Sequence, residues 1–200
     1  MEKEQSFRMY ENRWLEILSL SGPGVMIPFH FILIGVQVMM GWNFLMGKSI
    51  FGMLVLFTSG LLAWTFAEYI LHRYLFHFKN DHPWVKAFHF AMHGYHHEVP
   101  HDSSRLFMPP VPALLFLTLF WGVFYLCFEG GVWFFLPGFE LGYLLYSFVH
   151  FSVHTRKAPK GFEKLWHHHI IHHYKEPEKA FGVSSRFWDR VFRTLPQINK

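Results

Sequence analysis

Two trios of histidines in this 200-residue chain share the spacing HxxHH. On a helix, positions i, i+3 and i+4 lie on one face, so each trio can direct three imidazole rings toward one site. Neutral imidazole is a common metal ligand. Two such trios predict one metal centre built from two half-sites. The trios are His93, His96 and His97, and His169, His172 and His173.

Two further histidine pairs extend the pattern to ten residues. His150 and His154 are four residues apart and share a helix face. His72 and His77 are i and i+5, about 140° apart on an ideal α-helix, so they either serve different metals or lie where a helix ends. One metal ion takes about four to six ligands, so ten histidines predict two ions.

The donor set restricts the metal and its chemistry. An all-imidazole site suits zinc, copper, iron or nickel. A site with several thiolates is excluded, because Cys127 is the only cysteine. Two metals with neutral nitrogen ligands, next to the long apolar runs described below, suggest oxygen chemistry on an inert alkyl chain. Such oxidation needs a redox-active metal, which iron is and zinc is not. We therefore expect two iron ions in the active enzyme, with dioxygen as co-substrate and with zinc possible in purified samples.

The composition indicates a membrane protein with a sizeable aqueous part. Hydrophobic residues make up 52% of the chain, which contains 25 Phe and 8 Trp. Four apolar runs are close to the roughly 20 residues that cross a bilayer as a helix. They predict two transmembrane hairpins. The runs are 25–47, 50–67, 111–128 and 132–151, and the hairpins are 25–67 and 111–151.

The polar segments 68–110 and 152–200 carry most of the histidines. Every Lys and Arg except Lys48 lies in these segments or in residues 1–24, which are expected to form an interfacial helix. The positive-inside rule places such segments, and both termini, on the cytoplasmic face. The predicted fold is an all-α integral membrane protein, with four transmembrane helices and a cytosolic helical cap that holds a dinuclear metal centre in one catalytic domain.

Three segments resemble the fatty acid hydroxylase branch of the membrane-bound histidine-box oxygenases. EYILHRYLFH at 68–77 looks like the first histidine box, which sterol desaturases and carotenoid hydroxylases share. The segments 88–110 and 172–189, which include RLFMPP and FGVSSRFWD, are closer to fatty acid 2-hydroxylases. The resemblance covers roughly residues 60–195.

This resemblance implies oxygen-dependent hydroxylation at carbon 2 of a lipid acyl chain, in a fatty acid or a sphingolipid such as ceramide. By motif position it makes all ten histidines metal ligands. Larger family members carry an N-terminal cytochrome b5 domain, whereas about 24 residues precede the first apolar run here. We therefore expect a separate electron donor, cytochrome b5-like or ferredoxin-like, and a bacterial inner membrane rather than the endoplasmic reticulum.

Other polar residues lie near the boxes, outside the set of ten. Four of them are expected to orient imidazoles through the second ring nitrogen: His89, Glu68, Asp102 and Asp189. Surface or helix-cap positions are an equal alternative for the three carboxylates. His89, His167 and His168 stay open as metal contacts. Interfacial or hydrogen-bonded positions are expected for His30, His82 and His101.

Two other functions remain open from the sequence. A lipid or sterol desaturase or a carotenoid hydroxylase would share the boxes and differ in product. A metal-binding membrane protein, such as a zinc transporter or sensor, is the other alternative. Transport needs ionisable residues within the spans, and the spans hold almost none apart from Glu140, which disfavours transport. Nucleic-acid binding is not expected, because no basic run alternates with exposed aromatic residues.

Overall fold

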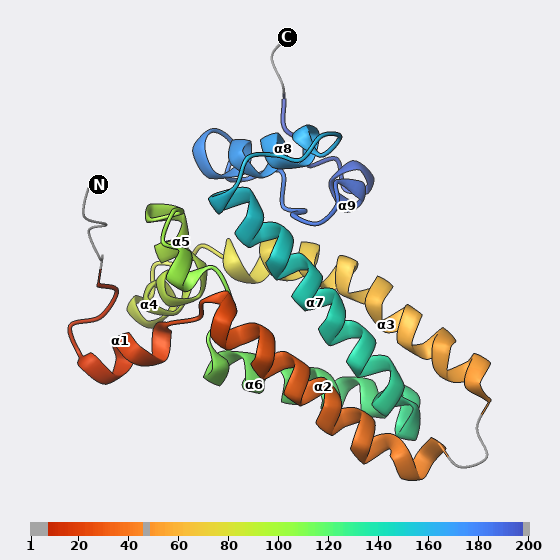
Figure 1. Ribbon diagram of the computed structural model, residues 1–200. Coiled ribbons are helices and arrows are strands. Elements are labelled where there is room, and N and C mark those ends of the chain that lie inside the picture. Colours follow the sequence, from red (N-terminus) through yellow and green to blue (C-terminus); the bar gives the residue numbers. More distant parts are fainter. Residues whose placement is uncertain (1–7, 46–48, 198–200) are drawn as a thin grey trace.

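The computed structural model describes residues 8–45 and 49–197, and its regular elements are all helical (Figure 1). The start of the predicted interfacial segment 1–24, the connection at Lys48 and the last three residues of the tail lie outside the described residues.

Four long helices form the body of the molecule, and α7 contacts the other three. Their predominantly apolar sequences favour helix in an apolar environment, because most backbone groups are then bonded within the segment. They lie alongside one another in Figure 1. The helices are α2 (Pro23–Leu45), α3 (Ile50–Ile70), α6 (Pro110–Phe128) and α7 (Val132–Thr155).

Three helical stretches of the described chain are long and apolar enough to cross a membrane. They are Pro23–Trp42, Ile50–Phe76 and Ser103–Thr155. The third stretch contains both α6 and α7, which a short turn at Glu129–Gly131 connects. The structure therefore shows an all-helical chain with three candidate spans, and the count of four stays a prediction.

Helices α3 and α7 pack closely because two glycines remove the side chains that would separate them. A Cβ at Gly138 would collide with the carbonyl oxygen of Phe57, and one at Gly60 with that of Phe135. Small residues allow such backbone contact between membrane helices. Trp64 of α3 and Tyr143 of α7 then meet above this contact, with ring centroids 5.2 Å apart.

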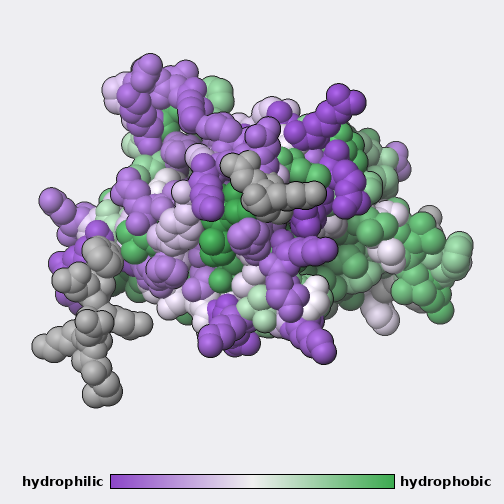
Figure 2. All heavy atoms as spheres, turned by 90° about the horizontal axis from the view of Figure 1, so that it is seen from above, coloured by the Kyte–Doolittle hydropathy of each residue, from purple (hydrophilic) through white to green (hydrophobic). Residues whose placement is uncertain are grey.

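The short helices gather at one end of the long ones, the end where both described termini lie in Figure 1. Viewed from the α8 side, hydrophilic side chains cover this end, and apolar surface appears beyond it toward the far ends of the long helices (Figure 2). The short helices are α1 (Arg13–Ser19), α4 (Pro83–His89), α5 (Tyr95–Glu98), α8 (Glu163–Tyr174) and α9 (Phe187–Val191).

Two π-helical turns lie at this end. The turn η1 (Leu71–Phe76) continues α3, and η2 (Phe90–Gly94) joins α4 to α5. Single π-turns are rare and are frequently found at functional sites. Both turns carry a histidine of the predicted boxes.

Candidate metal centre

The ten predicted histidines converge in two groups of five. Within each group, one ring nitrogen from every histidine lies within 4.8 Å of the others. Group A consists of His72, His77, His93, His97 and His172, and group B consists of His96, His150, His154, His169 and His173. The groups adjoin, since the rings of His97 and His173 stack with centroids 4.2 Å apart.

Each HxxHH trio is divided between the groups. His93 and His97 of the first trio join group A, while His96 between them joins group B. The second trio does the reverse, because His172 joins group A, whereas His169 and His173 join group B. Positions i and i+4 point more nearly in one direction than position i+3 does. The trios therefore interleave, and neither builds a half-site alone.

His72 and His77 join the same group, although an α-helix would separate them. The π-turn η1 begins just before His72 and ends at His77. An i→i+5 turn rotates less per residue than an α-helical turn, so residues five apart approach the same face. Of the two alternatives for this pair, the structure supports a helix end and not service of different metals.

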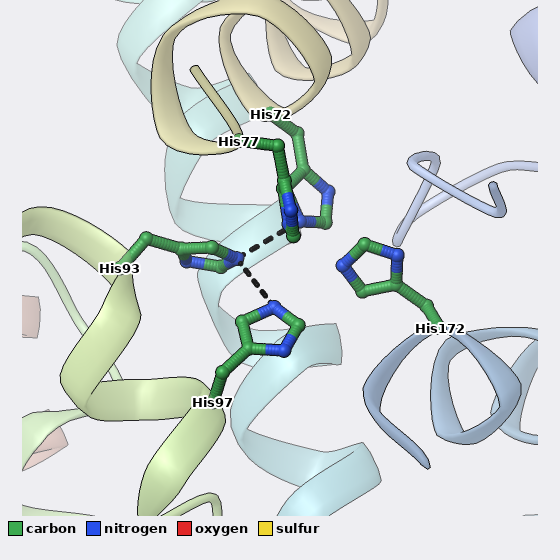
Figure 3. A group of neighbouring side chains, drawn as sticks. All are labelled: His72, His77, His93, His97 and His172. Atoms are coloured by element: carbon green, nitrogen blue, oxygen red, sulfur yellow. Dashed lines mark hydrogen bonds between the residues drawn. The ribbon is translucent and has the colours of Figure 1, made fainter. Parts of the chain in front are cut away.

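Short nitrogen–nitrogen distances define the centre of each group. In group A, Nε2 of His93 lies 3.0 Å from Nε2 of both His72 and His97 (Figure 3). In group B, Nε2 of His169 lies 2.9 Å from that of His154 and 3.1 Å from that of His173. One N–H cannot serve two such contacts, whereas lone pairs that converge on a cation account for both.

Backbone carbonyls orient several of the rings. Nδ1 of His172 donates to the carbonyl oxygen of Lys179 at 2.7 Å, and Nδ1 of His72 to that of Phe181 at 2.5 Å. A carbonyl only accepts, so Nδ1 carries the proton and the lone pair of Nε2 points into group A. His150 is held similarly in group B, by the carbonyl of Leu106 at 3.2 Å.

Burial keeps the imidazoles neutral. It lowers the pKa of His77 to about 2, that of His97 to about 3 and that of His172 to about 4. Burial also lowers the pKa of the remaining histidines of segments 90–97 and 167–173 that face the groups, and neighbouring imidazoles add to this effect. Neutral rings at pH 7 have free lone pairs, as metal ligation requires.

The donor geometry fits a metal ion in each group. Within the described chain, Nε2 of His77 and Nε2 of His172 are buried without a hydrogen-bond partner. Two imidazole nitrogens on opposite sides of one ion are about 4 Å apart, because each metal–nitrogen bond is about 2 Å. The 4.8 Å limit within each group is close to that span. Both histidine groups can therefore hold a metal ion.

Asp189 organises the loop that supports group A. Its two oxygens accept from the backbone N–H groups of Phe181 and Gly182 at 2.9 and 2.8 Å. It also accepts from Thr194 and from Nε2 of His168 at 3.0 Å. Burial alone would raise its pKa, but the bonds from His168, Thr194 and Gly182 lower it on balance. The imidazole that Asp189 contacts is therefore His168, outside the set of ten.

Glu68 and Asp102 differ from the expectation that they orient imidazoles. Glu68 is buried and accepts from the backbone N–H groups of Val183 and Ser184 at 2.7 and 2.8 Å. Asp102 accepts from the backbone N–H of Ser104 at Oδ1, and at Oδ2 it accepts from the hydroxyl of Tyr95 and pairs with Arg105. Glu68 thus acts on the same loop as Asp189, and Asp102 caps the turn before α6.

The other histidines have separate surroundings. His89 approaches group A only at its edge, with its ring 6.4 Å from that of His77. His167 is exposed, and His168 is buried against Asp189. The sequence left both open as metal contacts, because a triple histidine offers several registers. His30 is buried between the long helices, where its Nδ1 lies 2.7 Å from Oε1 of Glu140.

A largely apolar cavity of about 310 Å³ reaches both groups. Its wall includes His93 of group A and His96 and His150 of group B. Residues of α1 and Arg105 line another part of it, and Trp64 and Tyr143 line it between the long helices. Cavities of this size, apolar with a few polar groups, are typical of sites for small molecules.

Comparisons with known proteins agree with this site. Residues 57–194 match the family model described as fatty acid hydroxylase, which confirms the resemblance seen in the sequence. Fatty acid 2-hydroxylase of Mus musculus is 40% identical over 162 residues, which cover 77% of this chain and 42% of that protein. The ceramide very long chain fatty acid hydroxylase of Schizosaccharomyces pombe is 42% identical over 147 residues, covering 69% and 41%.

A solved structure has the same fold. It is described as full-length scs7p with only the hydroxylase domain visible, and it matches with a TM-score of 0.80 and 33% identity over 94% of this chain and 71% of that one. The chain spans less than half the length of the mouse and fission-yeast relatives.

The expectation of a bacterial inner membrane is wrong. The relatives come from mammals, yeasts and Arabidopsis thaliana, and they point to a eukaryotic membrane. That expectation depended on how few residues precede the first apolar run, which carries no information about the compartment.

Proposed function

Because this chain belongs to the fatty acid hydroxylase family, we propose that it hydroxylates carbon 2 of a lipid acyl chain, in a fatty acid or a ceramide, with dioxygen as co-substrate. The observation that carries this proposal is the apolar cavity whose wall includes histidines of both five-membered groups. Such a wall brings an alkyl chain against the only described site that is suited to two metal ions.

The ten histidines hold the two ions, five in each group. Iron bound there would supply the redox chemistry that oxidation of a C–H bond needs, and zinc would take the same nitrogens in purified samples without supplying it. The protein contributes neutral imidazoles in fixed tautomers. His72 and His172 are fixed by the carbonyls of the 179–184 loop, and His150 by the carbonyl of Leu106.

The catalytic domain lies partly in the membrane and partly in the cytosol. The hairpins 25–67 and 111–151 form four membrane spans, while segments 68–110 and 152–200 form a cytosolic cap around the histidines. Exposed apolar side chains on the long helices support this arrangement, as do the hydrophilic residues over the α8 end. Trp14 and Leu18 of α1 are also exposed, as a helix lying on the membrane surface requires.

The position of the reaction fixes how the substrate lies. Carbon 2 is adjacent to the head-group carbonyl, so both must lie against the histidines while the rest of the chain extends away. The part of the cavity near Tyr10, Ser19 and Arg105 suits the polar head group. The part near Trp64 and Tyr143 suits the chain, and its apolar wall excludes water from the reacting carbon.

The reaction also needs electrons. Conversion of a methylene and dioxygen to a hydroxymethylene and water consumes two electrons and two protons, which the substrate does not supply. A redox protein, cytochrome b5-like or ferredoxin-like, is the proposed donor. The open hollow beside His77 and His97, on the proposed aqueous side of group A, offers an approach for it.

Lipid mass spectrometry tests the function. Cells that express the chain should gain acyl chains heavier by one oxygen atom, with the hydroxyl at carbon 2, and cells that express His172→Ala at equal membrane levels should not. Loss of two hydrogens from the chain would instead indicate a desaturase. Hydroxylation retained in His172→Ala would contradict the ligand assignment.

A further inference from the structure

A second, smaller cavity lies next to the one that reaches the histidines. It has a volume of about 50 Å³ and lies among α2, α3, α6 and α7. Phe116, Leu117 and Phe120 of α6 line it, as does Phe139 of α7, and none of them lines the first cavity. The surface that it exposes is apolar, although His30 and Glu140 also line it, and none of the ten histidines reaches it.

One layer of side chains separates the two cavities. Four residues line both, and two of them, Trp64 and Tyr143, have rings in an edge-to-face contact with centroids 5.2 Å apart. The hydroxyl of Tyr143 accepts from the backbone N–H of Met108 at 3.0 Å, which fixes that ring. Within the described chain, the indole Nε1 of Trp64 has no hydrogen-bond partner, so packing against neighbouring rings holds this side of the partition. The four shared residues are Trp64, Leu71, Met108 and Tyr143.

The second cavity lies farther from the histidines along the same helix. Tyr143 precedes His150 by seven residues, about 10 Å along α7, and Glu140 precedes it by ten, about 15 Å. Glu140, Tyr143, Ser147 and His150 follow the helical repeat and lie on one face of α7. A chain that extends away from the histidines along this face meets first the partition and then the second cavity.

A buried polar group closes the far side of the second cavity. The carboxylate of Glu140 accepts from the side chain of Gln37 and lies 2.7 Å from Nδ1 of His30. All three are buried, and they tie α2 to α7. A hydrogen-bonded polar group at this depth is costly to displace, so it marks an end to the apolar path.

We propose that the second cavity takes the terminal carbons of the acyl substrate, and that the Trp64–Tyr143 partition together with the α6 wall sets the chain lengths that are hydroxylated. This proposal rests on the proposed function. The histidines select the carbon that reacts, counted from the head group. The partition and the second cavity select the length, counted from the other end.

Two substitutions with opposite expected effects test the proposal. Leu117→Phe adds bulk to the second cavity and should shift hydroxylation toward shorter chains. Trp64→Phe thins the partition and should shift it toward longer chains. The control is Leu119→Phe, the same substitution two residues further along α6, where Leu119 is 59% exposed and faces away from the cavity.

Cells expressing each variant would receive saturated acyl chains of graded length, and 2-hydroxy products would be measured as the ratio of longer to shorter chains. We expect that ratio to change by about tenfold in opposite directions, the scale on which an apolar pocket discriminates one methylene, and to stay unchanged in Leu119→Phe. A ratio, unlike total product, does not depend on how much protein accumulates. Unchanged ratios in both lining variants with hydroxylation intact would overturn the proposal alone, whereas no 2-hydroxy product from the unaltered chain would overturn the proposed function.

Discussion

Group B takes four of its five histidines from the regular helices α7 and α8, in pairs four residues apart, whereas group A takes three of its five from π-turns and their ends. The helices hold group B by their own packing. Group A depends in addition on the loop 179–184, whose carbonyls accept from His172 and His72. Two sites with the same ligand types therefore depend on different parts of the chain.

The surroundings of the two groups also differ. His77 and His97 of group A are half-buried and line an open hollow of about 790 Å³ at the aqueous side, whereas in group B only His173 is half-buried. The apolar cavity touches both groups from the other side. Group A is thus the group that the apolar cavity reaches at His93 and the open hollow reaches at His77 and His97. A loop supports this group, whereas group B takes four of its five histidines from α7 and α8.

Removal of one ligand from each group has the largest expected effect. His172→Ala should weaken metal binding in group A and His169→Ala should weaken it in group B, because each leaves four of five nitrogens and opens the buried site to water. We expect both variants to lose hydroxylation, and metal titration of purified protein to show weaker binding of one of the two ions. Equal loss of both ions in each variant would show that the groups form a single cooperative unit rather than two sites.

Asp189→Asn should damage group A more than group B. Both oxygens of Asp189 face N–H donors, at Phe181 and at Gly182, so an amide must turn its NH₂ toward one of them in either orientation. The loop that holds His72 and His172 then loses its anchor. We expect a loss of about 10- to 100-fold in hydroxylation, the usual effect of removing support for a metal ligand.

The matched control for this substitution is Asp81→Asn, which makes the same chemical change at a fully exposed side chain that pairs with Lys86. That variant should behave as the unaltered chain. Metal titration of Asp189→Asn should show weaker binding of one ion. Equal weakening of both would contradict the assignment of this loop to group A.

Histidine spacing and the resemblance to the family's histidine boxes were enough to predict which ten side chains converge. Eight of the ten have i, i+3 or i+4 spacings, which depend only on helix geometry, and His72 and His77 do not. The division of the ten histidines between groups A and B was not predictable. His72 and His77 share a group because of a π-turn, and no residue type in 71–76 signals one. The interleaving of the trios depends on how α5 and α8 approach each other, which is a tertiary feature.

The carboxylates show a second limit of the sequence. Glu68 and Asp189 were identified as supporting residues, yet they act on the backbone of 181–184 and not on the ligands that were expected. A carboxylate near a histidine box in sequence has many possible partners, and only the folded loop selects one. Likewise, four apolar runs were visible in the sequence, but nothing there indicated that α7 would contact the other three long helices.

Glu68→Gln should have a smaller effect than Asp189→Asn. The amide oxygen can still accept from the N–H groups of Val183 and Ser184, and the new NH₂ can donate to the hydroxyl of Ser184. Only the charge of the acceptor is lost, which is worth about 1 kcal/mol. We expect hydroxylation to fall by less than tenfold with both ions retained. Glu68→Ala, which removes the acceptor, should resemble Asp189→Asn in activity.

The smallest effect is expected at the rim of the hollow beside group A. Lys79 pairs with Glu178 there, but their side chains are 78% and 61% exposed. Exposed pairs contribute at most about 1 kcal/mol and are screened by salt, so Lys79→Ala should leave thermal unfolding in detergent nearly unchanged. Hydroxylation with a saturating electron donor should also be unchanged. If activity at limiting donor concentration fell while unfolding stayed the same, the rim would contact the donor, and the difference between the open group A and the enclosed group B would extend from structure to electron delivery.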